Sequence, residues 1–136
     1  MKTQEEIKDM LYQYLAGSAL KKALSGDVYV DKRPDSSKVE DVVIGGIDLG
    51  DGSVQEGAFN VNIHVPALKV KIGNTMEAQP DRKRLRALTR IAVDLLKTKI
   101  FEDCSAWVAN QALIKEPTLD DWYANIRIEI RAYETD

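Results

Sequence analysis

The sequence is poor in the residue types that serve metal binding, covalent cross-linking and most catalysis. It contains one cysteine, Cys104, and one histidine, His64, among 136 residues. A lone cysteine excludes an internal disulfide and fits a reducing compartment. These two residues lie far apart in the sequence and have no spaced carboxylates beside them, so they form no recognisable zinc ligand set. We therefore expect no metal ion, no cofactor and no small-molecule substrate.

Long apolar runs and ligand-binding loops are also missing. No run approaches the roughly 18 residues of a transmembrane helix, and residues 1–6 are polar, unlike a signal peptide. We expect a cytoplasmic protein that does not enter membranes. The glycines at 45–46 and 50–52 match neither G-x-G-x-x-G nor G-x-x-x-x-G-K. Asp48, Asp51 and Ser53 lack the glutamate that completes a calcium loop.

The few residues with reactive side chains have no partners in the sequence. His64 lies between asparagines on the expected outer face of a strand, which predicts a solvated or interface side chain and no catalytic base. Cys104 follows two acidic residues, which raise the pKa of a thiol, so it is expected to be structural. Asp120 and Asp121 read as a solvated turn. We predict that the protein is not an enzyme.

What the chain does contain is ordinary globular composition. Charged residues make up 30% and apolar residues 44%, and the formal net charge is −3. Two halves of a 136-residue chain would each be too small to bury enough surface, so residues 1–136 are expected to form one domain. The slight acidity provides no general attraction to nucleic acid or anionic membranes.

Two principal helices are predicted. Thr3 and Glu6 have the spacing of a capping box, and apolar residues then recur at helical spacing as far as Leu15, with a short second piece ending near Leu24. The other helix follows Pro80. Its apolar residues fall within one arc of about 140° at 100° per residue; they are Leu85, Leu88, Ile91, Ala92, Leu95 and Leu96.

Alternating apolar and polar residues predict five strands. They are residues 28–30, 39–47, 59–65, 106–114 and 122–131. In the third, Phe59, Val61, Ile63 and Val65 share one face, and Pro66 ends the strand. The order of helix, three strands, helix and two strands predicts an α+β fold. We expect a mainly antiparallel sheet of about five strands with the two helices packed on it.

Residues 67–79 interrupt this order. Lys69 and Lys71 alternate with apolar residues between Leu68 and Ile72, a pattern that suits an edge strand or a projecting arm because charge discourages unwanted pairing. Both an arm between subunits and a local hairpin remain open.

The second helix carries a basic face opposite its apolar arc. We define this basic face as Arg82, Lys83, Arg86, Arg90 and Lys97, which span about 100°. Asp94 is the nearby acid, four residues after Arg90. Most of the cations lie in the first half of the helix, where the dipole disfavours them. The face is either simply solvated or a surface for an acidic partner.

Partner binding is our working hypothesis for these cations. The candidate interface joins the basic face to four cations outside the helix, namely Lys32, Arg33, Lys69 and Lys71. An identical subunit or another acidic protein would suit it. Nucleic acid is disfavoured because no aromatic residues are interleaved with the cations and the chain is acidic overall.

Several stretches of the chain, in their order, resemble a known family. They are the helix at 7–24 with residues 26–29, the loop 32–34, residues 40–44 and 59–66, the helix at 84–96 and the closing strand 123–133. The most distinctive is Asn-Val-Asn-Ile-His-Val-Pro at 60–66. Together these patterns resemble the tail-completion, or tail-terminator, proteins of long-tailed bacteriophages and prophages.

The resemblance implies a small α+β subunit that forms a ring, often a hexamer, without catalysis or a cofactor. Such a ring caps the tail tube and joins it to the head. The implied partners are further copies of the chain, the tail-tube protein and head-connector proteins. The implied location is the bacterial cytoplasm during assembly and then the virion tail. The alternative from the residues alone is a small cytoplasmic module that binds a protein or nucleic acid.

Overall fold

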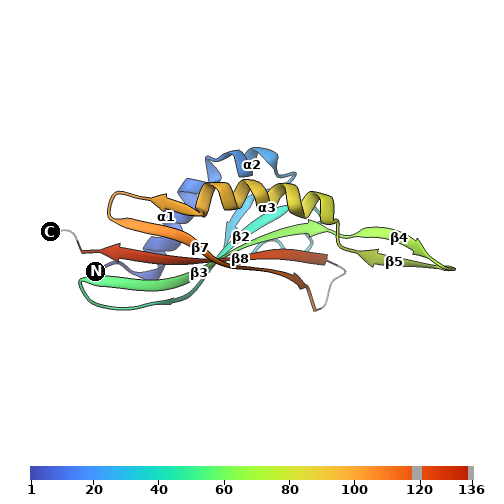
Figure 1. Cartoon of the computed structure of the whole chain (residues 1–136). Helices are drawn as coiled ribbons and strands as arrows, with labels where there is room; N and C mark the ends of the chain where they lie inside the picture. The colour runs from blue at the N-terminus through green and yellow to red at the C-terminus, as the bar shows by residue number, and fades with distance from the viewer. Residues whose placement is uncertain (118–120, 135–136) are drawn as a thin grey trace.

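The computed structural model describes residues 1–117 and 121–134. Within these residues the elements follow the order α1 (Gln4–Ala16), α2 (Ala19–Ala23), β1 (Val28–Val30), β2 (Asp41–Leu49), β3 (Val54–Pro66), β4 (Leu68–Ile72), β5 (Thr75–Gln79), α3 (Arg82–Leu96), β6 (Thr98–Ile100), β7 (Cys104–Lys115) and β8 (Asp121–Tyr133). The helices lie over a curled sheet, and a two-stranded arm projects beyond it (Figure 1).

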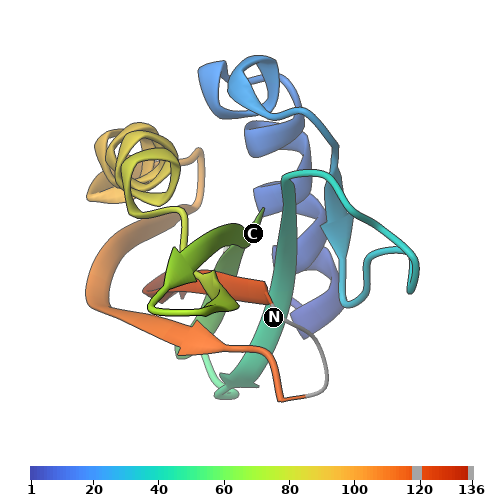
Figure 2. The same ribbon diagram turned by 90° about the vertical axis from the view of Figure 1, so that its right-hand side faces the viewer.

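The main sheet has the strand order β1-β2-β3-β8-β7-β6, and β4 and β5 pair only with each other. β1 runs parallel to β2, and the remaining neighbours are antiparallel. The predicted class, α+β with a mostly antiparallel sheet, is therefore confirmed. The sheet curls so that β7 bends up toward α3, whereas α1 lies beside β1 and β2 (Figure 2).

One face of the sheet forms the core with the helices. Phe59, Val61 and Ile63 of β3 are fully buried on this face, and Ile126 and Ile128 are their cross-strand partners on β8. The apolar arc of α3 packs against the same face, as its spacing predicts. Burial of one such side chain contributes roughly 1.5–3 kcal/mol, so this layer supplies most of the driving force for folding.

Helices α1 and α3 begin where the sequence predicts. The hydroxyl of Thr3 accepts from the backbone N–H of Glu6, whose carboxylate accepts in return from the Thr3 N–H, forming the capping box. Asp81 caps α3 by accepting a hydrogen bond of 3.1 Å from the N–H of Arg84. Both caps satisfy N–H groups that a helix cannot pair internally.

The prediction of about five strands is wrong in number. The sheet has six, because β6 contributes three residues that pair with residues 105–107 of β7. A three-residue strand is too short to show alternation. β3 also begins at Val54, five residues before the expected start, since residues 54–58 pair with β8 despite their polarity.

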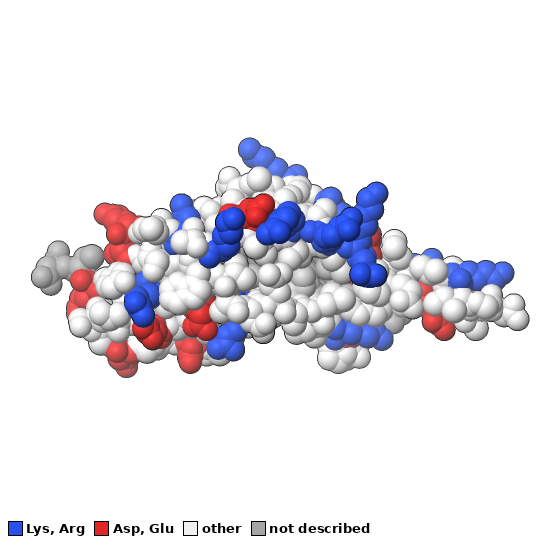
Figure 3. Space-filling view, in the orientation of Figure 1, with Lys and Arg blue, Asp and Glu red and all other residues white. Residues whose placement is uncertain are grey.

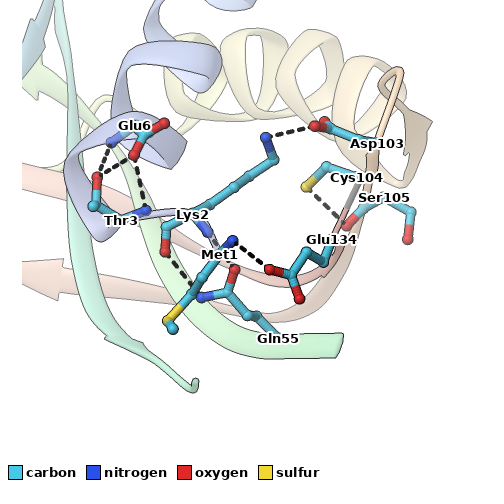
Figure 4. A network of polar contacts seen from close by, with 9 residues as sticks. All are labelled: Met1, Lys2, Thr3, Glu6, Gln55, Asp103, Cys104, Ser105 and Glu134. Carbon is cyan, nitrogen blue, oxygen red and sulfur yellow. Dashed lines mark hydrogen bonds and ion pairs between the residues drawn. The ribbon is translucent and has the colours of Figure 1, made fainter. Parts of the chain in front are cut away.

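The N-terminal segment is tied to the β2–β3 turn by a buried glutamine, Gln55 (Figure 4). Its amide donates to the carbonyls of Lys2 (2.9 Å) and Gly50 (2.8 Å) and accepts from the Lys2 N–H (2.6 Å). The Lys2 ammonium lies 2.5 Å from Asp103 in the β6–β7 turn. Three segments distant in sequence are thus held together at this end of the sheet.

At the other end, the chain makes a close approach at Gly26. A Cβ placed there would lie 2.1 Å from Oδ1 of Asp41 and 2.3 Å from the carbonyl oxygen of Glu40. The same Asp41 oxygen accepts from the N–H of Asp27 at 3.0 Å. Only glycine leaves room for this carboxylate to reach the backbone.

We predict that Gly26→Ala destabilises the protein by about 2 kcal/mol, because the Asp41 carboxylate and the backbone of Glu40 must move. Gly45→Ala is the matched control, since its Cβ would meet no atom within 4 Å. Its stability should stay within about 0.5 kcal/mol of the parent. Urea unfolding followed by circular dichroism measures both. Equal losses in the two variants would contradict the close approach at Gly26.

Candidate functional site

The basic face lies on the outer side of α3, and Lys and Arg side chains follow this ridge in Figure 3. Arg82, Lys83, Arg86 and Arg90 are all exposed. The predicted pair is present: a guanidinium nitrogen of Arg90 lies 3.2 Å from Asp94. Among the residues that the structure describes, the other three make no ion pair. Their charge is therefore directed at solvent or at an external partner.

Two other residues of α3 depart from the pattern of the basic face. Val93, which falls in its arc by sequence, is buried. Arg84 turns inward and bonds Glu40 at 2.9 Å as well as the carbonyl of Ala23. The Arg84 guanidinium holds the pKa of the Glu40 carboxyl below its usual value. Arg84 thus fastens α3 to α2 and to the start of β2.

Arg33, one of the predicted interface residues, bonds instead within the chain. Its side chain is only 11% exposed and reaches Asp41 at 3.4 Å and Asp121 at 3.0 Å. Asp121 is accordingly no solvated turn residue but the half-buried start of β8, and Asp120 lies outside the described residues. Lys32 beside it remains exposed and lies 3.0 Å from Asp35. Of the two cations predicted for the interface here, Lys32 is the exposed one.

The arm formed by β4 and β5 stands away from the sheet (Figure 1). Its register places Leu68, Val70 and Ile72 on one face and Lys69 and Lys71 on the other. All five are exposed, and Ile72 is 48% exposed. At the tip, Gly73 has φ +62°, the left-handed conformation that a two-residue hairpin loop needs. The segment is an arm with no core of its own.

His64 is buried, which overturns the prediction of a solvated side chain. It is 7% exposed, and the ring of Tyr123 stacks on it with centroids 4.8 Å apart; Arg33 and Pro34 line the same pocket as the imidazole. A pocket of about 470 Å³ opens beside the ring, and Nδ1 has no hydrogen-bond partner among the residues that the structure describes. Burial, followed by the charge of Arg33, lowers the pKa of His64 to about 4.

Cys104 lies in the core, where burial raises the pKa of its thiol to about 11 and the charge of Asp103 adds to the effect. The thiol is therefore protonated and unreactive at neutral pH. In residues 1–117 and 121–134, no group of three or more His, Cys, Asp or Glu side chains is placed to hold a metal ion. No helix in these ranges is long and apolar enough to cross a membrane.

A groove of about 690 Å³ runs between α3 and the strands β7 and β8. Arg82, Lys83 and Arg86 of the basic face form one wall, and Ala112 and Leu113 of β7 form the other. Sequence reasoning missed this groove, because residues 109–115 alternate too weakly to show which of their sides meets the helix. The structure thus joins the basic face to an exposed part of the sheet.

No family model matches the sequence, and no curated protein matches it. The solved virion of a native gene transfer agent particle contains a chain with a similar fold. The TM-score is 0.64 and the sequence identity is 15%, and the likeness covers 91% of this chain and 92% of that one. The two chains therefore share their fold over almost their whole lengths.

We predict that stability falls as the pH drops from 6.5 toward 4, because the unfolded chain then protonates His64 and the folded protein does not. Above pH 6.5 the imidazole is neutral in both the folded and the unfolded protein, so this loss of stability is confined to the range from pH 6.5 to about 4. It is at most about 3 kcal/mol. His64→Phe keeps the stacking on Tyr123 and should remove this part of the slope. Urea unfolding of both proteins at pH 7.5 and 4.5 tests it; parallel slopes would contradict it.

Proposed function

We propose that this protein is a non-catalytic virion-assembly protein, a tail-completion or tail-terminator subunit that forms a ring. The ring would cap the tail tube of a phage or prophage particle and join it to the head. The observation that carries the proposal is the fold shared with a chain of the gene transfer agent virion over 91% of this protein. The order of elements expected for tail-terminator proteins supports the same conclusion.

The distribution of charge supports self-association. The pairing of β3 with β8 places the β2–β3 turn and the end of β8 together, with exposed acids at Asp48, Asp51, Glu56 and Glu134. The arm and the start of α3 lie at the other end of the molecule. Acidic side chains crowd one end and basic ones the other in Figure 3. Residues 135 and 136 lie outside the described residues.

Opposite charges at two ends favour a head-to-tail contact between copies. Such contacts are heterologous, and they close into a ring when the rotation between copies permits. Exposed charges steer and orient partners more than they add affinity. The basic face would thus set the orientation of neighbouring subunits or of an acidic partner such as the tail-tube or head-connector protein. Assembly would take place in the bacterial cytoplasm and end in the virion tail.

We predict that Arg86→Glu combined with Arg90→Glu weakens assembly, because it places acids where an acidic surface should dock. The oligomer should dissociate at roughly tenfold higher protein concentration than the parent's, about 1.4 kcal/mol. Light scattering over a concentration series, with and without the tail-tube protein, measures this. The thermal transition should stay near the parent's, since both side chains are exposed.

Lys22→Glu is the control, an exposed charge reversal on α2 at a residue that is not part of the basic face. It should leave assembly unchanged. A parent protein that stays monomeric at every concentration and ignores the tail tube would refute the proposal. Salt-sensitive DNA binding that the double variant abolishes would support the alternative of a nucleic-acid-binding module.

A further inference from the structure

The outer edge of β7 is open along half of its length. β6 pairs with residues 105–107 of β7, and β8 pairs with the inner side of residues 110–115. On the outer side of residues 109–115 there is no strand within the described residues. Those residues are all exposed, including Leu113 at 51%. An open edge presents unpaired N–H and C=O groups and is a template for another strand. Natural proteins usually cover such an edge with another element or keep it short and charged. Within the described residues, the outer edge at residues 109–115 is not covered by a strand.

The open edge borders the groove beneath the basic face. The groove, about 690 Å³, contains three cations and no acid among its lining residues. Apolar side chains, among them Leu85, Leu113 and Ile126, also line it. A strand added to β7 would therefore place alternate side chains against these apolar residues under a basic wall. The fitting occupant is an extended segment with an apolar stripe and a negative charge.

The arm of the same chain has this composition. Its apolar face carries Leu68, Val70 and Ile72, and Glu77 lies on that face directly opposite Val70. Glu77 is the acid of the arm, whose cations Lys69 and Lys71 point to the other face. A two-stranded hairpin is marginally stable in water without a surface to pack on. Within the described residues, the arm pairs with no strand of the main sheet, and the outer side of residues 109–115 pairs with no strand either.

We propose that the arm of one copy docks onto the open edge of β7 in the next copy, with its apolar face in the groove under α3. This inference rests on the self-assembly proposed above and names the surfaces that carry it. The arm extends away from its own body along the long axis of the molecule (Figure 1). The contact is therefore made between copies, and it is heterologous, as a ring requires.

The main-chain bonds of strand addition would provide affinity, and the side chains would set the register. Glu77 would face the wall formed by Arg82, Lys83 and Arg86. Lys69 and Lys71 would remain on the side away from the groove. The basic face would thus recognise an acid that belongs to the neighbouring arm.

Cysteine cross-linking between two variants tests the contact. Val70→Cys marks the arm and Leu113→Cys marks the edge, each in a Cys104→Ala background. The two variants are mixed at a concentration at which the parent assembles, and the mixture is mildly oxidised. It should give several-fold more cross-linked dimer than either variant alone. Lys22→Cys replaces Leu113→Cys as the matched control and should give only the background amount. Equal yields with Lys22→Cys would overturn the proposal.

A charge exchange provides a second test without oxidation. Glu77→Lys and Arg86→Glu should each raise the dissociation constant of self-association about fivefold, the effect of an ion pair worth about 1 kcal/mol. Mixing the two variant chains should restore association. The lysine at position 77 of one variant then faces the glutamate at position 86 of the other, and the charges are opposite again. Light scattering of the separate and mixed variants measures this. If mixing restores nothing, Glu77 does not face the basic wall.

The outcomes separate this inference from the proposed function. Rings that form without the Val70–Leu113 cross-link would overturn the arm contact and leave the ring proposal standing. A specific cross-link in an assembly that binds no tail-tube protein would uphold the arm contact and count against the role in tails. A cross-link formed within one chain carrying both cysteines, at a dilution where the parent is monomeric, would also overturn the contact between copies.

Discussion

The antiparallel pairing of β3 with β8 organises this molecule. The pairing runs from Val54–Tyr133 to Pro66–Asp121 without a register shift. Because side chains alternate along a strand, it presents one continuous apolar face on which α3 packs, whereas α1 packs on the neighbouring strands β1 and β2. It also decides which segments share an end: the acidic turns at one end, and the arm with the start of α3 at the other. The polarity of the surface is thus a consequence of one strand pair.

Neighbouring cations have opposite roles because the helix turns by about 100° per residue. Arg84 points inward and bonds Glu40, whereas Lys83 and Arg86 point into the groove. Buried pairs such as Arg33 with Asp41 hold the loop over the sheet, where an uncompensated charge would be costly. Arg82, Lys83 and Arg86 of the basic face are exposed and make no ion pair within the described residues. This division separates the residues that maintain the fold from those available to a partner.

The repeat of apolar residues along the sequence correctly predicted which side of a single helix or strand faces the core. The 3.6-residue repeat identified the buried and basic faces of α3, and alternation identified the core face of β3. The burial of His64 could not be predicted, because the ring that stacks on it, Tyr123, is distant in sequence. Arg33 was misassigned for the same reason, since its partners come from two other strands. The groove between α3 and the strands β7 and β8 could not be predicted, because it is formed by the curl of the whole sheet.

The arm is continuous with the middle of the sheet. β4 follows β3 after the single residue Ala67, and β3 is hydrogen-bonded on both sides, to β2 and to β8. A pull on the arm along the long axis therefore enters β3 parallel to the strand and perpendicular to its ladder of hydrogen bonds. Such a load acts on all these bonds together in shear, so none yields before the others. A particle held together through this arm would transmit tension into the interior of each subunit's main sheet.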